Sequence, residues 1–330
     1  MYLVLDVGAT TIKYALMTGE GEILEKGKTP TPIGDDKEPK DLVEAIGVIY
    51  EKFANSSRIE GIAMGLPGQI DVKRGIVYNG GGIRYLHEVH LQELIQARCN
   101  NTPVSLENDG KCAALAEIWK GNAKDVKDAC VLVFGTGIGG GIIRGRKVIH
   151  GKHLLAGEMS FIMDDMERAD LDKLPPGENL METIVAPSMP QALPYTWCTK
   201  QSSVNMCMRI ALAKGLPKEE VTGEKVYQWV REGDELVINM LEDTYFSIAK
   251  MCLSLFVILD PEIILIGGGI SAEPDFIKGI KKYVEQLKRL SNVYTNIKID
   301  TCKFLNDSNL LGALYNFKQK YACSDESCTA

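Results

Sequence analysis

Residues 129–143 read ACVLVFGTGIGGGII. An apolar, β-branched run comes first, a glycine-rich segment follows, and two isoleucines close the stretch. The pattern predicts a buried strand over 129–134, a turn over 135–141 and a second strand from residue 142. A turn of this composition presents backbone N–H groups with little side-chain obstruction, as phosphate-binding loops do. The stretch therefore predicts a phosphate-binding unit of strand, turn and strand.

The same design occurs near the start of the chain. Residues 2–17 read YLVLDVGATTIKYALM, an apolar strand over 2–7, a turn at 8–11 and a second strand from residue 12. Because the turn joins two strands, it differs from the strand-to-helix junction of a Walker loop or a dinucleotide fold. Either turn alone is a weak signal, since hairpins are common. Two such units, one lobe apart, form an internal repeat and predict a duplicated α/β architecture.

Between the two turns in the chain lies VSLENDGKCAALAE, residues 104–117. A short β-prone run gives way to Asn-Asp-Gly and then to an alanine-rich helical pattern, so Asn108 and Asp109 stand at the start of a helix. An aspartate at this place is most often only a helix cap. A carboxylate that accompanies two phosphate turns can instead accept a proton from a substrate hydroxyl during phosphoryl transfer. We predict this second role for Asp109.

Composition narrows the class of protein. The 330 residues suffice for two lobes, and 45% hydrophobic with 25% charged residues is an ordinary globular balance. A net charge of -7 without a basic stripe argues against a nucleic-acid partner. The most apolar window, Leu253 to Leu259, is far too short for a membrane span. The nine cysteines form no C-x-x-C pair, and the first residues lack the features of a signal peptide, so we expect a reducing cytoplasm.

The second half of the chain predicts a long helix and two further strands. Glu235 to Leu259 is a long, largely apolar helical stretch, and residues 263–266 form a buried strand that a glycine triplet closes. The triplet, with Gly268 and Gly269, suits the flat approach of an adenine ring or a ribose, although a tight strand-to-helix turn needs the same residues. The last strand is predicted over 297–302. A helix is also predicted at 179–185, within a Pro- and Gly-rich surrounding.

Six motifs, in this order along the chain, together resemble those of the ROK family. They are DVGAT (6–10), GLPG (65–68), END (107–109), FGTGIGGG (134–141), AGE (156–158) and the run from Asp260-Pro261 to Gly269. The ROK family groups repressors, open reading frames and sugar kinases within the hexokinase–actin–Hsp70 ATPase superfamily. The resemblance implies a duplicated ribonuclease-H-like α/β fold with two lobes and an interlobe cleft. The small lobe would comprise residues 1–120 with the C-terminal helix 309–322, and the large lobe residues 121–308 with a helical insert.

The resemblance also implies the ligands and the residues that hold them. ATP and Mg²⁺ would be the cofactors, and a small-molecule sugar the substrate. The expected nucleotide-binding residues are Asp6, Gly8, Thr10, Thr11, Lys13, Gly135, Thr136, Gly137, Gly268 and Gly269, and Asp6 would hold the magnesium ion through water. The expected sugar-binding residues are Gly68, Asn108, Asp109, Glu158 and Glu182. Asp109 would accept the proton of the attacking hydroxyl.

Departures from the family pattern limit the substrate prediction. The family's kinases carry Glu-x-Gly-His followed by a Cys-rich zinc motif, whereas this chain has Glu158-Met-Ser-Phe, and its next cysteines, Cys198 and Cys207, are far downstream. Four zinc ligands cannot be assembled from such spacing, so we predict no zinc site. The altered side of the pocket is the side that the resemblance implies faces the anomeric and C2 groups. Phosphorylation of the 6-hydroxyl of a hexose or β-glucoside is therefore our first expectation, and an N-acetylmannosamine or other amino-sugar kinase the second.

Two alternatives without kinase activity follow from the same family. A ROK repressor carries a winged-helix domain ahead of the first phosphate turn, but only five residues precede Asp6 here, so we do not expect one. A sugar-binding ROK protein without turnover remains the third alternative, because the histidine after Glu158 is missing. Since relatives are often dimers, we expect a homodimer.

Overall fold

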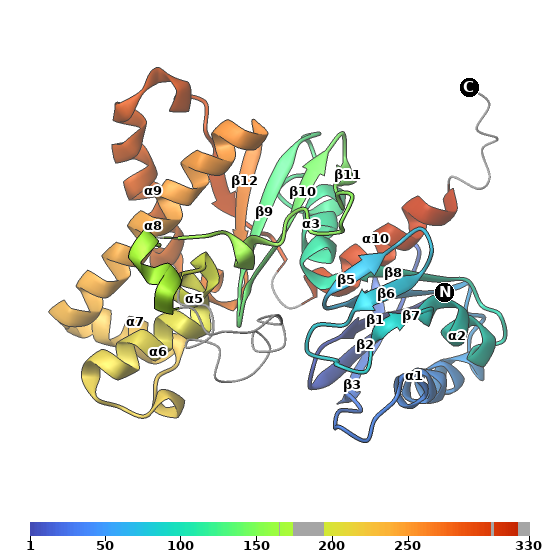
Figure 1. Ribbon diagram of the computed structural model, residues 1–330. Helices are drawn as coiled ribbons and strands as arrows, with labels where there is room; N and C mark the ends of the chain where they lie inside the picture. The colour runs from blue at the N-terminus through green and yellow to red at the C-terminus, as the bar shows by residue number, and fades with distance from the viewer. Residues whose placement is uncertain (165, 174–194, 305–306, 323–330) are drawn as a thin grey trace. The chain divides into compact units, whose positions relative to one another are not determined.

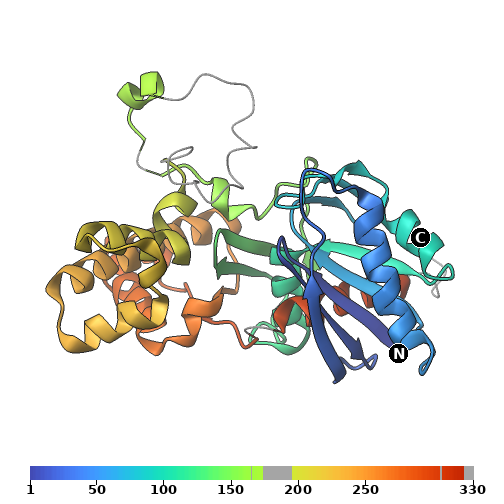
Figure 2. The same ribbon diagram turned by 90° about the horizontal axis from the view of Figure 1, so that it is seen from below.

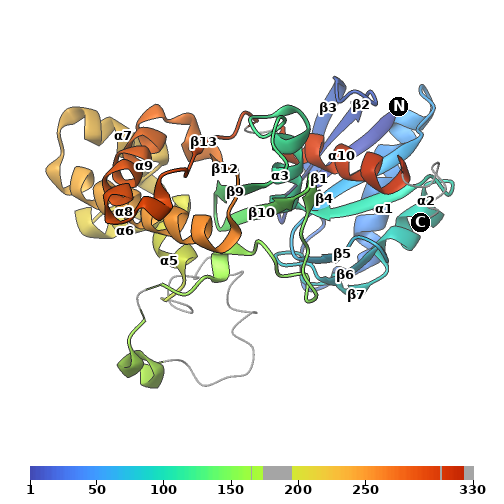
Figure 3. The same ribbon diagram turned by 90° about the horizontal axis from the view of Figure 1, so that it is seen from above.

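The structure is a computed structural model that describes residues 1–330 apart from 165, 174–194, 305–306 and 323–330. The chain folds into two compact units. Unit 1 comprises Met1–Lys124, Lys147–Ala156 and Asn306–Ala330, and unit 2 comprises Asp125–Arg146 and Gly157–Leu305. Each unit combines a sheet with helices, as the three views show (Figure 1, Figure 2 and Figure 3).

Unit 1 is built on a five-stranded sheet of order β3-β2-β1-β4-β8. Its strands are β1 (Tyr2–Val7), β2 (Thr11–Met17), β3 (Ile23–Pro30), β4 (Gly61–Leu66), β5 (Gln69–Asp71), β6 (Ile76–Asn79), β7 (His87–Val89), β8 (Val104–Asn108) and β11 (Lys147–Val148), and its helices are α1 (Pro39–Ala54), α2 (Leu91–Arg98), α3 (Asp109–Lys120) and α10 (Ser308–Ala322). β1 runs antiparallel to β2 and parallel to β4, and β4 runs parallel to β8. The carboxyl ends of β1, β4 and β8 therefore lie at one edge of the sheet.

Both faces of this sheet are covered by helices, as the continuous apolar runs of β1 and β4 require. On one face, Leu42 and Ile46 of α1 join Leu3 and Leu5 of β1 in a single buried cluster. α10 packs against α3, β4 and β8. Where the two helices cross, a Cβ added to Gly312 of α10 would lie 1.7 Å from the Cys112 carbonyl oxygen of α3. A glycine is therefore required for this backbone contact.

A second, three-stranded sheet of order β5-β6-β7 follows β4 in unit 1. The sequence does not predict it, because its strands are only three or four residues long and show no clear alternation of apolar and polar residues.

Unit 2 contains a sheet in which the order is β10-β9-β12-β13. Its strands are β9 (Ala129–Phe134), β10 (Ile138–Arg144), β12 (Ile263–Gly267) and β13 (Ile299–Thr301), and its described helices are α5 (Trp197–Gln201), α6 (Ser203–Lys214), α7 (Gly223–Glu232), α8 (Glu235–Leu259) and α9 (Pro274–Leu287). β9 is antiparallel to β10 and parallel to β12. Thus β9 occupies the place in unit 2 that β1 occupies in unit 1, and both predicted units of strand, turn and strand are confirmed.

Several predicted boundaries need correction. The second strand after the turn begins at Ile138 rather than at residue 142, because the glycine run pairs with β9 instead of continuing the turn. The last strand covers Ile299–Thr301 instead of 297–302, whereas the long helix α8 has the predicted bounds. The helix predicted at 179–185, with Glu182, lies outside the described residues. In the part of the chain that the structure describes, no helix combines the length and the apolar character needed to cross a bilayer.

Candidate active site

The turn between β1 and β2 carries a pair of opposite charges. Asp6 and Lys13 are direct partners across the two strands, and Lys13 Nζ lies 3.4 Å from Asp6 Oδ2. The other carboxylate oxygen, Oδ1, accepts a hydrogen bond of 3.0 Å from Asn309 Nδ2 of α10. Asp6 is buried and Lys13 is half exposed. The lysine thus lies on the same face of the hairpin as the carboxylate, a direction that the sequence left open.

Hydrogen bonds from Thr31 hold this turn in place. Gly8 N–H donates within the turn to the Thr11 carbonyl at 3.0 Å. Thr31 Oγ1 donates to the Gly8 carbonyl at 2.7 Å, and Thr31 N–H donates to the Thr10 carbonyl at 3.1 Å. The Thr10 side chain is exposed, and Thr11 is half-buried. Sequence reasoning missed Thr31, because it lies 20 residues beyond the turn and belongs to no motif.

The surroundings of Asp6 are compatible with a magnesium ion held through water. Its two oxygens contact Asn309 and Lys13, and a water molecule between the carboxylate and the ion leaves room for those contacts. Mg²⁺ is usually held by one or two carboxylates together with water and substrate phosphates. A single carboxylate beside the predicted phosphate-binding turn is therefore a sufficient protein contribution.

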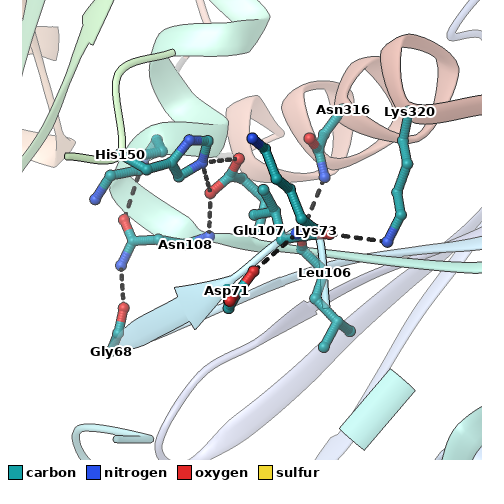
Figure 4. A network of polar contacts seen from close by, with 11 residues as sticks. Gly68, Asp71, Lys73, Leu106, Glu107, Asn108, His150, Asn316 and Lys320 are labelled. Atoms are coloured by element: carbon teal, nitrogen blue, oxygen red, sulfur yellow. Dashed lines mark hydrogen bonds and ion pairs between the residues drawn. The ribbon is translucent and has the colours of Figure 1, made fainter. Parts of the chain in front are cut away.

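Asn108, rather than Asp109, caps helix α3. The Asn108 Oδ1 atom accepts a hydrogen bond of 3.1 Å from Lys111 N–H, and its Nδ2 atom donates to the Gly68 carbonyl at 3.1 Å (Figure 4). Asp109 is the first residue of the helix, and its Oδ1 atom accepts from Gly110 N–H at 2.8 Å. The interpretation of Asp109 as a cap is therefore wrong, because its neighbour performs that role.

Gly68 is fixed by backbone geometry. Its φ is +99°, a region that side chains disfavour, and an added Cβ would lie 1.8 Å from the Asn79 carbonyl oxygen. Gly68 lies two residues after the end of β4, and its carbonyl accepts a hydrogen bond from Asn108, which ends the neighbouring strand β8. The structure thus brings Gly68, Asn108 and Asp109 together at the edge where the β1–β2 turn also begins.

Glu107 and His150 form a contact beside Asn108 that the sequence did not indicate. The Glu107 side chain is 1% exposed, and His150 Nε2 lies 3.1 and 2.9 Å from its two oxygens. Glu107 Oε1 also accepts from Asn108 N–H at 2.8 Å. The buried Glu107 side chain therefore has two hydrogen-bond partners, as a buried polar group requires.

The turn between β9 and β10 in unit 2 has no charged side chain. Gly135 N–H donates to the Gly137 carbonyl at 2.9 Å, and Thr136 between them is exposed. Ser160 Oγ accepts from Ile138 N–H at 2.9 Å and so supports the start of β10. On the other side, Val204 N–H donates to the Gly135 carbonyl at 3.3 Å.

The glycines after β12 lie beside this turn, because β12 runs parallel to β9 with Gly267 opposite Val133. Gly268 has a φ of +94°, and an added Cβ would lie 2.0 Å from the Phe134 carbonyl oxygen. The close approach of the chain itself therefore explains Gly268. At Gly135 and Gly269, by contrast, no described atom lies within 4 Å of an added Cβ.

Glu158 of unit 2 lies two residues before Ser160, which supports the turn between β9 and β10. It is half-buried and follows Gly157, whose φ is +84°. A short 3₁₀ helix, Met159–Phe161, comes next and contains Ser160. Among the residues that the structure describes, no group of three or more His, Cys, Asp and Glu side chains is placed to hold a metal ion. The absence of zinc stays a prediction.

Comparison with known proteins gives matches over almost the whole chain. The model of the ROK family matches residues 2–320. A β-glucoside kinase from Listeria monocytogenes is 29% identical over 315 residues, 96% of each chain, and a glucokinase from Halalkalibacterium halodurans is 26% identical, over 97% of this chain and 95% of that one. The crystal structure of a ROK family protein from Streptococcus pneumoniae in complex with sucrose superposes with a TM-score of 0.79 at 29% identity, over 98% of this chain and 99% of that one.

These matches confirm the α/β fold class of the actin and hexokinase ATPases, and the prediction of an enzyme of the carbohydrate kinase type. Because the family model matches nearly the whole chain, the chain belongs to the ROK family.

Proposed function

We propose that the protein transfers the γ-phosphoryl group of ATP to the 6-hydroxyl of a β-glucoside or a hexose. The observation that carries this proposal is that Asn108, and not Asp109, caps helix α3. Because Asn108 supplies the cap of α3, the fold does not need the Asp109 carboxylate for that purpose. Asp109 nevertheless stands at the sheet edge where the β1–β2 turn begins.

Asp109 would orient the sugar hydroxyl and take its proton while the oxygen attacks the γ-phosphorus in line. The N-terminus of a helix favours the ionised form of a carboxylate and so weakens it as a base. In a loose phosphoryl-transfer transition state the proton leaves late, so orientation contributes more than base strength. Bound Mg²⁺ would neutralise charge that develops on the phosphate oxygens. Asn108, Glu158 and the Gly68 loop would bind the sugar.

The two glycine turns support ATP as the donor. Gly135 and Gly269 have neither a positive φ nor a described neighbour within 4 Å of an added Cβ, so folding does not explain the choice of glycine at these positions. Close approach of a phosphate and of the nucleoside does explain it. Thr10, Thr11 and Thr136 would add donors, and Lys13 a positive charge.

The β-glucoside preference rests on likeness of sequence. The β-glucoside kinase from Listeria monocytogenes matches nearly the whole chain, and the run after Glu158 lacks the histidine and cysteines of the zinc-containing kinases. An altered pocket wall toward the anomeric and C2 groups would admit an aglycone. A homodimer in the cytoplasm stays a prediction.

A coupled ATP assay with methyl β-glucoside, cellobiose, glucose, N-acetylmannosamine and N-acetylglucosamine tests the substrate. We expect the highest kcat/KM with one of the β-glucosides. Asp109→Asn should lower kcat about a thousandfold and leave the sugar KM within a few-fold, because a general base contributes to the chemical step.

Glu93→Gln is the matched control for Asp109→Asn, since it replaces an exposed carboxylate by an amide in the first turn of α2. Its kcat should stay at the value of the unaltered protein. Retained turnover in Asp109→Asn would remove Asp109 from the mechanism, and an unaltered protein without turnover on any of the five sugars would remove the proposed activity.

A further inference from the structure

We propose that Glu107 and His150 form a positioning pair that holds the sugar-binding residues in place. The inference rests on the proposed function, because it assigns the pair to the sugar side of the reaction. Neither residue needs to touch the substrate. The pair acts through Asn108 (Figure 4), and through the chain that leads from His150 to Glu158.

The Glu107 carboxylate is held on two sides. A carboxylate oxygen can only accept, so His150 Nε2, 2.9 and 3.1 Å away, carries the proton of this contact. Asn108 N–H donates to the same carboxylate at 2.8 Å. Because Glu107 is almost wholly buried, loss of the imidazole would leave a charged group with too few partners. The carboxylate would then draw in water or shift, and the backbone of Asn108 would move with it.

Asn108 passes this restraint on to the rest of the site. Its side chain binds Lys111 N–H at the start of α3 and the Gly68 carbonyl after β4. Asp109 is the next residue, and a small displacement of a catalytic group is costly to the reaction. The buried carboxylate therefore fixes the place where β8, the Gly68 loop and α3 meet.

His150 fixes the other sugar-binding segment through the chain. It belongs to residues 147–156, which are part of unit 1. Ala156 N–H donates to the His150 carbonyl at 3.1 Å and closes a loop, and Gly157 and Glu158 follow directly. One imidazole thus restrains the segment from which the chain continues to Glu158. In metal sites, removal of the hydrogen-bond partner behind a ligand commonly changes affinity or activity by one or two powers of ten, and we expect a change at the lower end of that range here.

The test compares three variants. His150→Leu removes the donor, His150→Gln keeps an N–H donor for Glu107, and His153→Leu makes the same change at an exposed histidine of the same segment. For His150→Leu we expect a sugar KM raised about tenfold or more, with the ATP KM changed less than about twofold. His150→Gln should return the sugar KM to within about threefold of the unaltered protein, and His153→Leu should leave it unchanged.

Hydrogen–deuterium exchange supplies a readout that does not depend on turnover. His150→Leu should speed exchange in peptides that cover residues 104–112 and 147–156, and His153→Leu should not. If His150→Leu equals His153→Leu in both measurements, or if it raises the ATP KM as much as the sugar KM, the positioning pair is refuted. An unaltered protein that phosphorylates no sugar refutes the proposed function instead, and the exchange result then decides on the pair alone.

Discussion

The two hairpins of the repeat have the same path but different side chains. In both, a buried strand turns back on an antiparallel partner and lies parallel to another strand. One residue pair beyond the turn, unit 1 has Asp6 opposite Lys13, whereas unit 2 has Val133 opposite Gly139. The first hairpin therefore carries a carboxylate and an ammonium group, and the second carries backbone and hydroxyl donors alone.

The supports of the two turns differ as well. Thr31, from the segment after β3, and Asn309, from α10, hold the first hairpin and its carboxylate. Ser160 and the N-terminal residues of α6 hold the second. The difference indicates a division of tasks under the proposed function. The charged hairpin would act on the reacting phosphoryl group and its metal ion, and the uncharged hairpin would grip the rest of the nucleotide.

Among replacements in the two hairpins, that of Asp6 should lower kcat the most. Asp6→Asn keeps an acceptor for Asn309 but removes the charge, so kcat should fall about a hundredfold, as for loss of one electrostatic stabiliser of a transition state. Val133→Thr changes the corresponding position of unit 2 and should leave kcat within about twofold, because no charge is lost there. Steady-state kinetics over a range of Mg²⁺ concentrations measures both. Equal losses in the two variants would show that the hairpins share one task.

Removing the lysine of the first hairpin should have a smaller effect. Lys13→Met should lower kcat/KM for ATP about tenfold, since a contact between an ammonium group and a phosphate contributes roughly 1.5 kcal/mol. Lys28→Met is the control, because Lys28 is exposed and is the partner of Lys13 on β3. The difference in kcat/KM for ATP between Lys28→Met and Lys13→Met should become smaller as the salt concentration is raised, since salt screens an exposed charge. Equal values in the two variants at low salt would place Lys13 outside the phosphate site.

Replacing Gly135 of unit 2 has the smallest expected effect on the reaction. Gly268, also of unit 2, is the matched control, because its replacement should change the stability of the fold. Gly135→Ala should raise the ATP KM roughly threefold and change the unfolding free energy by less than about 0.5 kcal/mol, because its Cβ enters open space. Gly268→Ala should cost about 2 kcal/mol of stability, since it adds strain at a φ of +94° and a contact with the Phe134 carbonyl. Denaturant unfolding and ATP titration separate the two. If Gly135→Ala destabilised the fold as much as Gly268→Ala, its glycine would be explained without a nucleotide.

The local sequence was sufficient to predict the repeated hairpins and the membership of the ROK family. Each hairpin is a contiguous run of strand, turn and strand, and the change from Asn-Asp-Gly to alanine-rich sequence marks the start of α3, so hydrophobic pattern and turn chemistry suffice. The 25 residues of α8 form one uninterrupted pattern between Asp234 and Asp260, and the structure has that helix at the predicted bounds. The order of the motifs then indicated the ROK family, which the match over residues 2–320 confirms.

Only the tertiary structure decided which residues support those motifs. Asn309 reaches Asp6 from 303 positions away, Thr31 reaches Gly8 from 23, and His150 reaches Glu107 from 43. None has a local signal, because sheet pairing and helix packing bring together segments that the sequence separates. The cap of α3 is a related case. Either Asn108 or Asp109 satisfied the sequence rule, and the choice fell to Asn108 because the Gly68 carbonyl lies where the Asn108 amide can bind it.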